Sequence, residues 1–284
     1  MAKYSILLAS CMLAVYTTLL HFLPFRSHLP LHVQQGKYLI AENFLYDKAK
    51  PRDVVIVGSS MAERLEESML KPSVLNLAIS GERSTTGMSL LALNGKYPKV
   101  LLVEVNILTR LEDTLFLNSY QSSWVQNLKQ TLPFLQERNQ LLTRTLNGIH
   151  AIHPLVKKKP TVSSAVLNSV QNNHLALQND TSQFKMIRQN VNELRNMVSA
   201  FSKKGIKIVL FRMPLEKRTQ QILDKSKRVQ FERKQLTDKL LNLPNVSMIP
   251  EDTVYEYHTT DGVHLIADDA QYFANYLLKK VTIL

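Results

Sequence analysis

Strand-like apolar runs alternate with helix-like stretches from residue 53 to the end of this 284-residue chain. Short unbroken apolar runs are typical of strands buried on both faces, whereas apolar residues three or four apart are typical of helices. The strand-like runs lie at 54–57, 74–79, 100–105, 206–211 and 246–249, and the helix-like stretches at 61–70, 84–93, 183–203, 218–241 and 267–280. This alternation predicts an α/β fold, a three-layer doubly wound parallel sheet with right-handed crossovers.

The interval 109–179, after the third strand, breaks this alternation. It is polar, mostly helical in pattern, and carries the sequence KKKP at 157–160. Because it is too long for a structureless loop in a compact domain, we interpret it as a helical insertion in an α/β domain that spans 53–284. The lysine run is most simply a solvated turn, although its place after a strand also suits a lid or a contact with a membrane or partner.

The N-terminal segment has the composition of a membrane-spanning helix. Residues 4–23 contain no Asp, Glu, Lys or Arg, and a helix of that length rises about 30 Å, the thickness of a bilayer's hydrocarbon core. The sequence predicts a transmembrane signal anchor at 1–24 and a juxtamembrane connector at 25–52. We expect a single-pass protein of the cell membrane with an extracytoplasmic catalytic domain, although Lys3, Arg26 and Lys37 leave the orientation open.

Two kinds of processing compete with this interpretation. The sequence LASC, which ends at Cys11, resembles a lipoprotein cleavage site, but few apolar residues precede it and the apolar run continues beyond it. A cleaved secretory signal needs a small-x-small site near the end of its apolar run, and the sequence HFLPFR offers none.

Composition and charge narrow the classes of partner and cofactor. A hydrophobic content of 45% with 20% charged residues is typical of a folded protein. The single cysteine excludes an intramolecular disulfide and a multi-cysteine metal site, and no histidine spacing indicates a ligand set, so we expect no metal and no cofactor. The net charge of +12 favours an anionic contact such as a membrane surface or an acidic glycan, but scattered Lys and Arg without a recognition motif argue against nucleic acid.

Polar residues follow the predicted strands at positions that would meet along one edge of the sheet. Open parallel sheets bind ligands beyond the carboxyl ends of their strands. The residues at those ends are Gly58-Ser59-Ser60, Ser80-Gly81-Glu82 and Glu104-Val105-Asn106, and Asp261 and His264 precede the last helix. The two serines alone would be read as helix caps, but a serine, an aspartate and a histidine at one edge point to nucleophilic catalysis.

These motifs resemble those of the SGNH (GDSL-type) hydrolase superfamily, from residue 53 to the C-terminus apart from the insertion. The tripeptide that ends at Ser60 matches the family's first block, Gly81 the glycine of the second, Asn106 the asparagine of the third, and Asp261 and His264 the Asp-x-x-His of the last. The resemblance implies that Ser60, His264 and Asp261 form a catalytic triad. It also implies an oxyanion hole made by Gly81, Asn106 and the Ser60 N–H.

Elementary chemistry gives the same roles to these side chains. A serine hydroxyl is a poor nucleophile until a base accepts its proton, which His264 would do. Asp261 would fix the imidazole tautomer and stabilise the imidazolium. Each donor aimed at the developing oxyanion is worth about 3–4 kcal/mol in the transition state, and a glycine at position 81 would let its N–H approach the substrate closely.

The third block departs from the family pattern, which is Gly-x-Asn-Asp. Glu104 and Ile107 stand where the family has its glycine and its aspartate. Because alternate residues of a strand share one face, Glu104 would lie beside Asn106 and orient it, orient a substrate hydroxyl, or pair with an arginine. Ser59 and Arg212, which also lie at strand ends, are further candidates for substrate binding, and Arg212 suits an anionic group.

The resemblance implies a serine acyl hydrolase or O-acyltransferase that acts on O-acetyl esters through an acyl-enzyme. In membrane-anchored branches of the superfamily, related domains add or remove acetyl groups of cell-envelope polysaccharides. We therefore expect an acylated glycan or other O-acyl ester as substrate, with a membrane protein as a candidate acyl donor. The alternative is a catalytically inactive SGNH-like scaffold or binding module of an envelope polysaccharide complex.

Overall fold

The computed structural model describes residues 2–22, 33–46, 52–145 and 183–283, with three two-residue helical fragments between 164 and 173. The chain divides into two compact units, one made of Met1–Ala49 and Thr114–Lys157 and the other of Lys50–Asp113 and Lys158–Leu284. We call the first the helical unit and the second the α/β unit. The lysine run of the predicted insertion lies outside the described residues.

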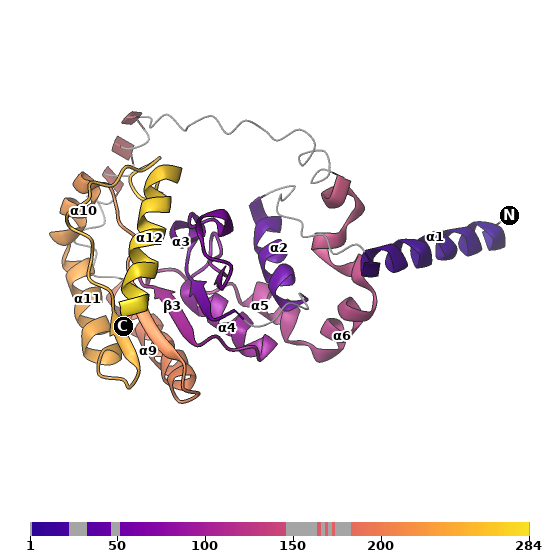
Figure 1. Ribbon diagram of the computed structural model, residues 1–284, viewed down its shortest axis with the longest axis horizontal. Helices are drawn as coiled ribbons and strands as arrows, with labels where there is room; N and C mark the ends of the chain where they lie inside the picture. Colours follow the sequence, from indigo (N-terminus) through magenta and orange to yellow (C-terminus); the bar gives the residue numbers. More distant parts are fainter. Residues whose placement is uncertain are drawn as a thin grey trace. The chain divides into compact units, whose positions relative to one another are not determined.

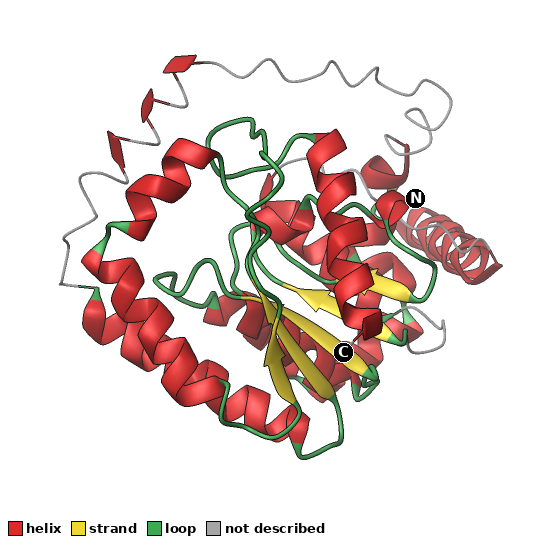
Figure 2. Cartoon of the chain, turned by 60° about the vertical axis from the view of Figure 1, so that its left-hand side comes forward, coloured by secondary structure: helices red, strands yellow, loops and turns green. Residues whose placement is uncertain are grey.

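Five parallel strands form the sheet of the α/β unit, in the order β2-β1-β3-β4-β5 (Figure 1, Figure 2). The strands are β1 Val54–Val57, β2 Val74–Asn76, β3 Val100–Glu104, β4 Lys207–Phe211 and β5 Val246–Met248. In register, Ile56 pairs with Leu102, and Leu102 pairs with Val209. The predicted parallel α/β sheet is confirmed, and its strand order reverses at β1 and β3, the place where open sheets bind ligands.

Helices cover both faces of this sheet. They are α3 Ser60–Glu63, α4 Ser84–Asn94, α9 Phe184–Ser202, α10 Lys217–Asp224, α11 Lys227–Leu240 and α12 Ala267–Ile283, with the 3₁₀ helix η1 Glu67–Met69. Ile56, Leu102 and Val209 point to one face, where they share an apolar cluster with α3 and α12. On the other face α4 lies so close that a Cβ on Gly87 would meet Cγ1 of Val57 at 2.7 Å. Alternation along β1 therefore produces two apolar layers around the sheet.

Two stretches predicted as continuous helices are interrupted. The 61–70 stretch forms only α3 and η1, because the side-chain amide of Asn76 donates to the carbonyls of Ala62 at 2.8 Å and Leu65 at 2.9 Å. These bonds satisfy carbonyls at a helix end. The 218–241 stretch is two helices, since Ser226 caps α11 by accepting from the Val229 N–H, and a serine cap favours a new helix start.

The helical unit combines helices from two separate stretches of the chain. They are α1 Ala2–Phe22, α2 Val33–Leu45, α5 Thr114–Gln121 and α6 Ser123–Thr131, with the 3₁₀ helices η2 Pro133–Leu135 and η3 Glu137–Asn139. α2 lies where the sequence predicted a connector, and the elements from α5 to η3 lie in the predicted insertion. Tyr38 of α2 packs edge-on against Phe116 of α5, with ring centroids 5.2 Å apart. The predicted connector therefore contributes a packed helix.

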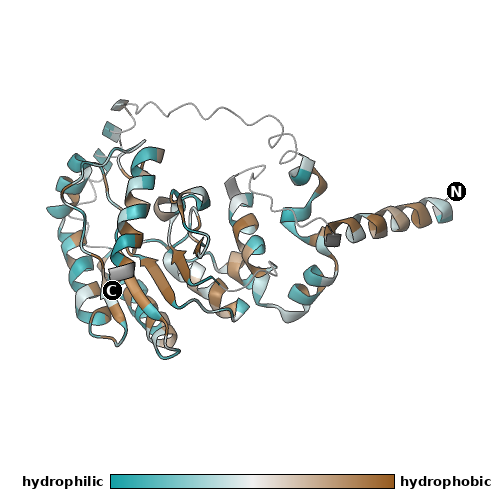
Figure 3. Ribbon diagram, viewed as in Figure 1, coloured by the Kyte–Doolittle hydropathy of each residue, from teal (hydrophilic) through white to brown (hydrophobic). Residues whose placement is uncertain are grey.

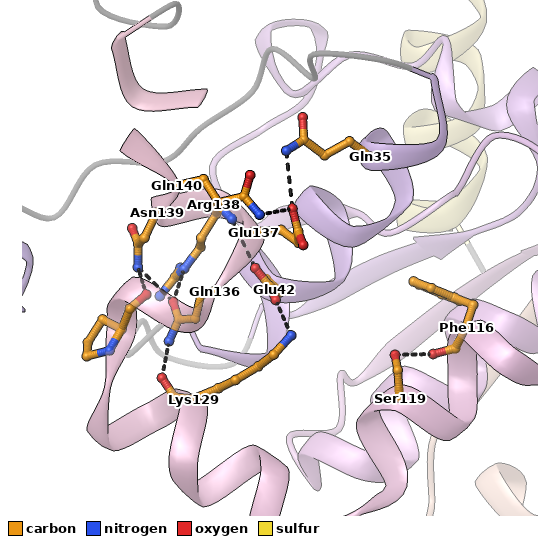
Figure 4. Close-up of polar contacts among 11 residues, drawn as sticks. Gln35, Glu42, Phe116, Ser119, Lys129, Gln136, Glu137, Arg138, Asn139 and Gln140 are labelled. Atoms are coloured by element: carbon orange, nitrogen blue, oxygen red, sulfur yellow. Dashed lines mark hydrogen bonds and ion pairs between the residues drawn. The ribbon is translucent and has the colours of Figure 1, made fainter. Parts of the chain in front are cut away.

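A buried carboxylate joins α2 to the segment around α6 (Figure 4). Glu42 accepts from Nζ of Lys129 at 2.8 Å and from the backbone N–H of Arg138 at 3.0 Å. Burial raises the pKa of Glu42, and the Lys129 ammonium opposes that rise. Because a buried charge is tolerated only when it is paired and hydrogen-bonded, this contact fixes three elements of the helical unit together.

Among the described helices, α1 is the one long and apolar enough to cross a membrane, over Lys3–Leu20 (Figure 3). Its large apolar side chains from Tyr4 to Leu19 are mostly exposed, whereas Leu20 is buried. A helix of this kind near an N-terminus serves as a membrane anchor or as a signal sequence.

Candidate active site

The turn between β1 and α3 holds Ser60 at the carboxyl edge of the sheet. Gly58 follows β1, Ser59 caps α3 by accepting from the Met61 N–H at 3.2 Å, and Ser60 is the first residue of the helix. A side chain at position 58 is excluded, because a Cβ there would lie 2.4 Å from Oε2 of Glu104. The tight turn brings the half-buried Ser60 to the wall of a cavity.

Ser60, His264 and Asp261 are joined by hydrogen bonds. Nε2 of His264 lies 2.9 Å from Oγ of Ser60, and Nδ1 of His264 lies 2.7 Å from Oδ2 of Asp261. Because an ionised carboxylate only accepts, Nδ1 carries the proton and Nε2 is left to accept from the serine hydroxyl. The His264 side chain is 21% exposed, so the imidazole is open to a ligand. This is the arrangement that nucleophilic catalysis by a serine requires.

The loop that carries Asp261 and His264 is fixed by its own hydrogen bonds. Oδ1 of Asp261 accepts from the N–H groups of His264 at 2.9 Å and Val263 at 3.1 Å, and the Thr260 N–H donates to the His264 carbonyl at 2.8 Å. Burial tends to raise the pKa of Asp261, but the hydrogen bonds from the His264 ring and from the two N–H groups together lower it to about 2. Asp261 is therefore an anion at neutral pH and can stabilise an imidazolium.

Ser59 and Glu104 bind each other beneath the turn, which corrects their predicted role as substrate-binding residues. Both are 2% exposed. Oε2 of Glu104 accepts from the Ser59 N–H at 2.6 Å, and both carboxylate oxygens lie 2.9 Å from Oγ of Ser59. Burial raises the pKa of Glu104, and the hydrogen bonds from Ser59 oppose the rise. A pair buried in this way does not reach a ligand, and the Glu104 carboxylate orients Ser59 and not Asn106.

Asn106 lines the cavity together with Ser60. Its Oδ1 accepts from the Met213 N–H at 2.7 Å, and its Nδ2 donates to the Met213 carbonyl at 2.8 Å. An amide nitrogen carries two N–H groups, so one of them is left for a ligand. The two bonds to Met213 hold the amide in one orientation.

Gly81 lies in the loop after β2, with a φ of 84°. A Cβ at this position would meet no atom within 4 Å. The left-handed backbone conformation, and not crowding by neighbouring atoms, therefore explains the glycine.

Glu63 is a residue of this region that the sequence did not single out. Burial raises the pKa of Glu63, and attraction to Arg64, the polar groups of Ser80 and attraction to His264 oppose the rise. An acidic residue in the first turn of a helix is common for reasons of the helix dipole alone, so no sequence signal distinguished it.

A cavity of about 850 Å³ opens beside Ser60 and His264, a volume typical of small-molecule sites. Asn106 and Arg212, both singled out from the sequence, line it together with Arg110. The other charged residues of its wall are Lys217, Asp224, Arg228, Glu232, Arg233, Glu251, Asp252 and Glu256. All eight lie in α10 and α11 or in the stretch after β5, where no motif marks them.

Arg212 and Glu232 belong to one charged cluster in this wall. Nη1 of Arg212 lies 3.0 Å from Oε1 of Glu251. Glu232 is buried, and burial raises its pKa to about 7 against the attraction of Arg212, Arg228 and Arg233. The charge of the cavity wall therefore changes near neutral pH.

No protein-family model matches the chain, and no curated protein matches it. A solved protein of Streptococcus pneumonia, provisionally described as a platelet activating factor, is 13% identical with a TM-score of 0.45, over 98% of both chains. A GDSL-like lipase of Bacteroides thetaiotaomicron is 13% identical with a TM-score of 0.36, over 88% of this chain and 97% of the lipase. At these TM-scores neither likeness bears on the fold or the activity.

Proposed function

We propose that this chain is an SGNH (GDSL-type) serine acyl hydrolase or O-acyltransferase that acts on O-acetyl esters through an acyl-enzyme. One observation carries the proposal: Ser60 Oγ, the His264 ring and Asp261 are linked at 2.9 Å and 2.7 Å at the wall of a ligand-sized cavity. Helix capping explains a serine at a strand-to-helix turn, but it does not explain a histidine bound to that serine and to a carboxylate.

Acylation begins with attack of Ser60 Oγ on the carbonyl carbon of the ester, while Nε2 of His264 takes the hydroxyl proton. The carbonyl oxygen becomes an anion, which the N–H groups of Ser60 and Gly81 and the free amide N–H of Asn106 stabilise. The tetrahedral intermediate then expels the alcohol, which takes the proton from His264. The acetyl group remains on Ser60 as an ester.

Deacylation repeats these steps with an acceptor hydroxyl. The acceptor gives its proton to His264 and attacks the acyl-enzyme, and Ser60 leaves with that proton. Water as acceptor yields acetate, whereas a sugar hydroxyl yields a new ester. The balance depends on how well the cavity binds a sugar and excludes water.

We infer that the substrate is an O-acetylated polysaccharide of the cell envelope, with a membrane protein as acyl donor where the enzyme is a transferase. The cavity wall carries charged groups from α10, α11 and the stretch after β5, which would contact the polar groups of a glycan. Arg212 would bind an acid group of the glycan by exchanging its contact with Glu251. The composition of α1 supports a single-pass anchor, and we infer that the α/β unit lies outside the cytoplasm.

Labelling with a fluorophosphonate and hydrolysis of p-nitrophenyl acetate test the proposal on the full chain in detergent. Both activities should be lost in Ser60→Ala and kept in Ser199→Ala, a matched control in α9 away from the cavity. A wild-type chain that neither binds the probe at Ser60 nor exceeds the rate of Ser60→Ala would instead support the inactive scaffold.

A further inference from the structure

The apolar stretch of α1 contacts the rest of the helical unit before that stretch ends. The Tyr16 hydroxyl donates to the backbone carbonyl of Asn139, and Leu20 is buried. Tyr16 lies four residues before Leu20, the end of the apolar stretch, which is about 6 Å along a helix. If this stretch spans the hydrocarbon core, Asn139 is held within about one helical turn of the boundary between acyl chains and headgroups.

The segment around Asn139 is held firmly within the helical unit (Figure 4). The Gln136 amide donates to the Lys129 carbonyl at 2.7 Å, and Nδ2 of Asn139 donates to Oε1 of Gln136 at 2.9 Å. The adjacent Arg138 N–H is bound to the buried Glu42. These bonds join η2 and η3 to α6 and α2, so the depth of Asn139 sets the depth of the neighbouring elements.

Large apolar side chains are exposed on the elements that lie next to this contact along the chain or pack against them. The exposed fraction is 68% for Trp124 in α6, 40% for Leu135 in η2, 69% for Leu141 and 62% for Leu142. η2 packs against both α1 and α6, and Leu141 and Leu142 follow Asn139 by two and three residues. Exposing a leucine to water forgoes about 1.5–3 kcal/mol of burial, and tryptophan is enriched at membrane interfaces.

We propose that Trp124, Leu135, Leu141 and Leu142 form a membrane footing that inserts into the lipid headgroup layer beside α1. A lipid surface is the occupant that the structure favours, because the footing belongs to the segment that is bonded to α1 inside its apolar stretch. The footing rests on the proposed retention of α1 as an anchor and does not depend on the proposed activity. It holds the helical unit against the bilayer surface, which adds a second membrane contact to the anchor.

Trp124 is the single tryptophan of the chain and reports directly on the footing. The full chain is reconstituted in phosphatidylcholine vesicles that contain lipids brominated either near the glycerol end or near the methyl end of the acyl chain. We expect about a twofold loss of Trp124 emission with the first lipid, because the interfacial layer lies next to those bromines, and a smaller loss with the second. Acrylamide added to the water should quench weakly.

Three other results would overturn the proposal. Strong quenching by acrylamide with none by either lipid would place Trp124 in water. Protection from acrylamide and from both lipids would mean that protein covers this face, such as a second copy of the chain. An intact mass that lacks α1 would also overturn it, since no anchor would then be present.

A substitution series separates the footing from general effects on the fold. A triple variant should reduce the lipid quenching of Trp124 and raise its quenching by acrylamide. It combines Leu135→Ser, Leu141→Ser and Leu142→Ser. Leu111→Ser, at an equally exposed leucine of the α/β unit, should change neither. Aryl-acetate hydrolysis by the same vesicles reports separately on the proposed activity, so the failure of one proposal is distinguishable from failure of the other.

Discussion

Oε2 of Glu104 accepts a hydrogen bond from the backbone N–H of Ser59 at 2.6 Å, which places a buried carboxylate from β3 directly beneath the turn that carries Ser60. The same carboxylate accepts from the Ser59 hydroxyl. Glu104 is therefore a positioning residue for Ser60. It acts through Ser59 and does not contact a substrate.

Replacing Glu104 tests this positioning role. Glu104→Ala leaves a buried N–H and hydroxyl without acceptors, so we expect a loss of about 2–5 kcal/mol of stability and a kcat that falls more than KM changes. Glu104→Gln keeps the shape of the side chain and one acceptor oxygen, so it should retain more of the stability and more of the kcat than the alanine variant. Thermal unfolding and ester hydrolysis measure the two effects, and an alanine variant with wild-type kcat would show that the contact is structural only.

The fixed imidazole predicts a large effect of Asp261→Asn. The asparagine keeps the shape but stabilises the imidazolium poorly and permits the wrong tautomer, so kcat should fall by roughly 10³–10⁴-fold with little change in stability. The rate of fluorophosphonate labelling at Ser60 should fall in parallel. A loss smaller than about tenfold would mean that Asp261 does not support His264 in catalysis.

The low pKa of Asp261 bears on the pH dependence of the reaction. That pKa is about 2, so this group is already ionised across the working range. The pH profile of kcat/KM should therefore contain no ionisation that belongs to Asp261. Rates of p-nitrophenyl acetate hydrolysis, corrected for the Ser60→Ala background, give this profile for the wild type and for Asp261→Asn, and an ionisation that the asparagine variant lacks would contradict the prediction.

Glu232 predicts a pH-dependent stability of the α/β unit. Its pKa is raised from the ordinary 4.5 to about 7, so between these values the folded chain binds a proton that the unfolded chain has released. The contribution of Glu232 to the free energy of unfolding is greatest below pH 4.5. It falls by about 3 kcal/mol in total as the pH rises to about 7. Relative to wild type, Glu232→Gln should therefore gain stability as the pH rises, which circular dichroism melts at several pH values measure. A constant difference between the two proteins would show that Glu232 does not titrate in this range.

The two glycines of the site should respond differently to alanine. At Gly58 a Cβ would lie 2.4 Å from Glu104 and 2.7 Å from Cβ of Ala62, so Gly58→Ala must displace the turn and should abolish labelling of Ser60. At Gly81 the space is open and only the left-handed backbone is strained, at about 1–2 kcal/mol. Gly81→Ala should therefore fold and retain part of the activity, and equal losses in the two variants would contradict the steric argument.

The order of strands and helices, and the side chains gathered at one sheet edge, were predictable from the sequence. Short apolar runs and helical periodicity are local signals, and the carboxyl ends of parallel strands meet at one edge whatever the details of packing. Ser60, Asp261 and His264 could therefore be placed near one another before any contact was known. The sequence did not predict the break within 218–241, because the helical spacing of apolar residues continues across Ser226. The serine nevertheless caps a new helix at that point.

Only the tertiary structure decided which polar partners meet. The third-block residue Glu104 binds Ser59, and Glu42 joins a helix from the predicted connector to the segment around α6. These contacts join residues that are 45 and 87 positions apart, and no periodicity in the chain specifies which buried carboxylate will face which donor. That choice follows from the crossovers and from the need to satisfy every buried charge, so it is made when the layers pack together.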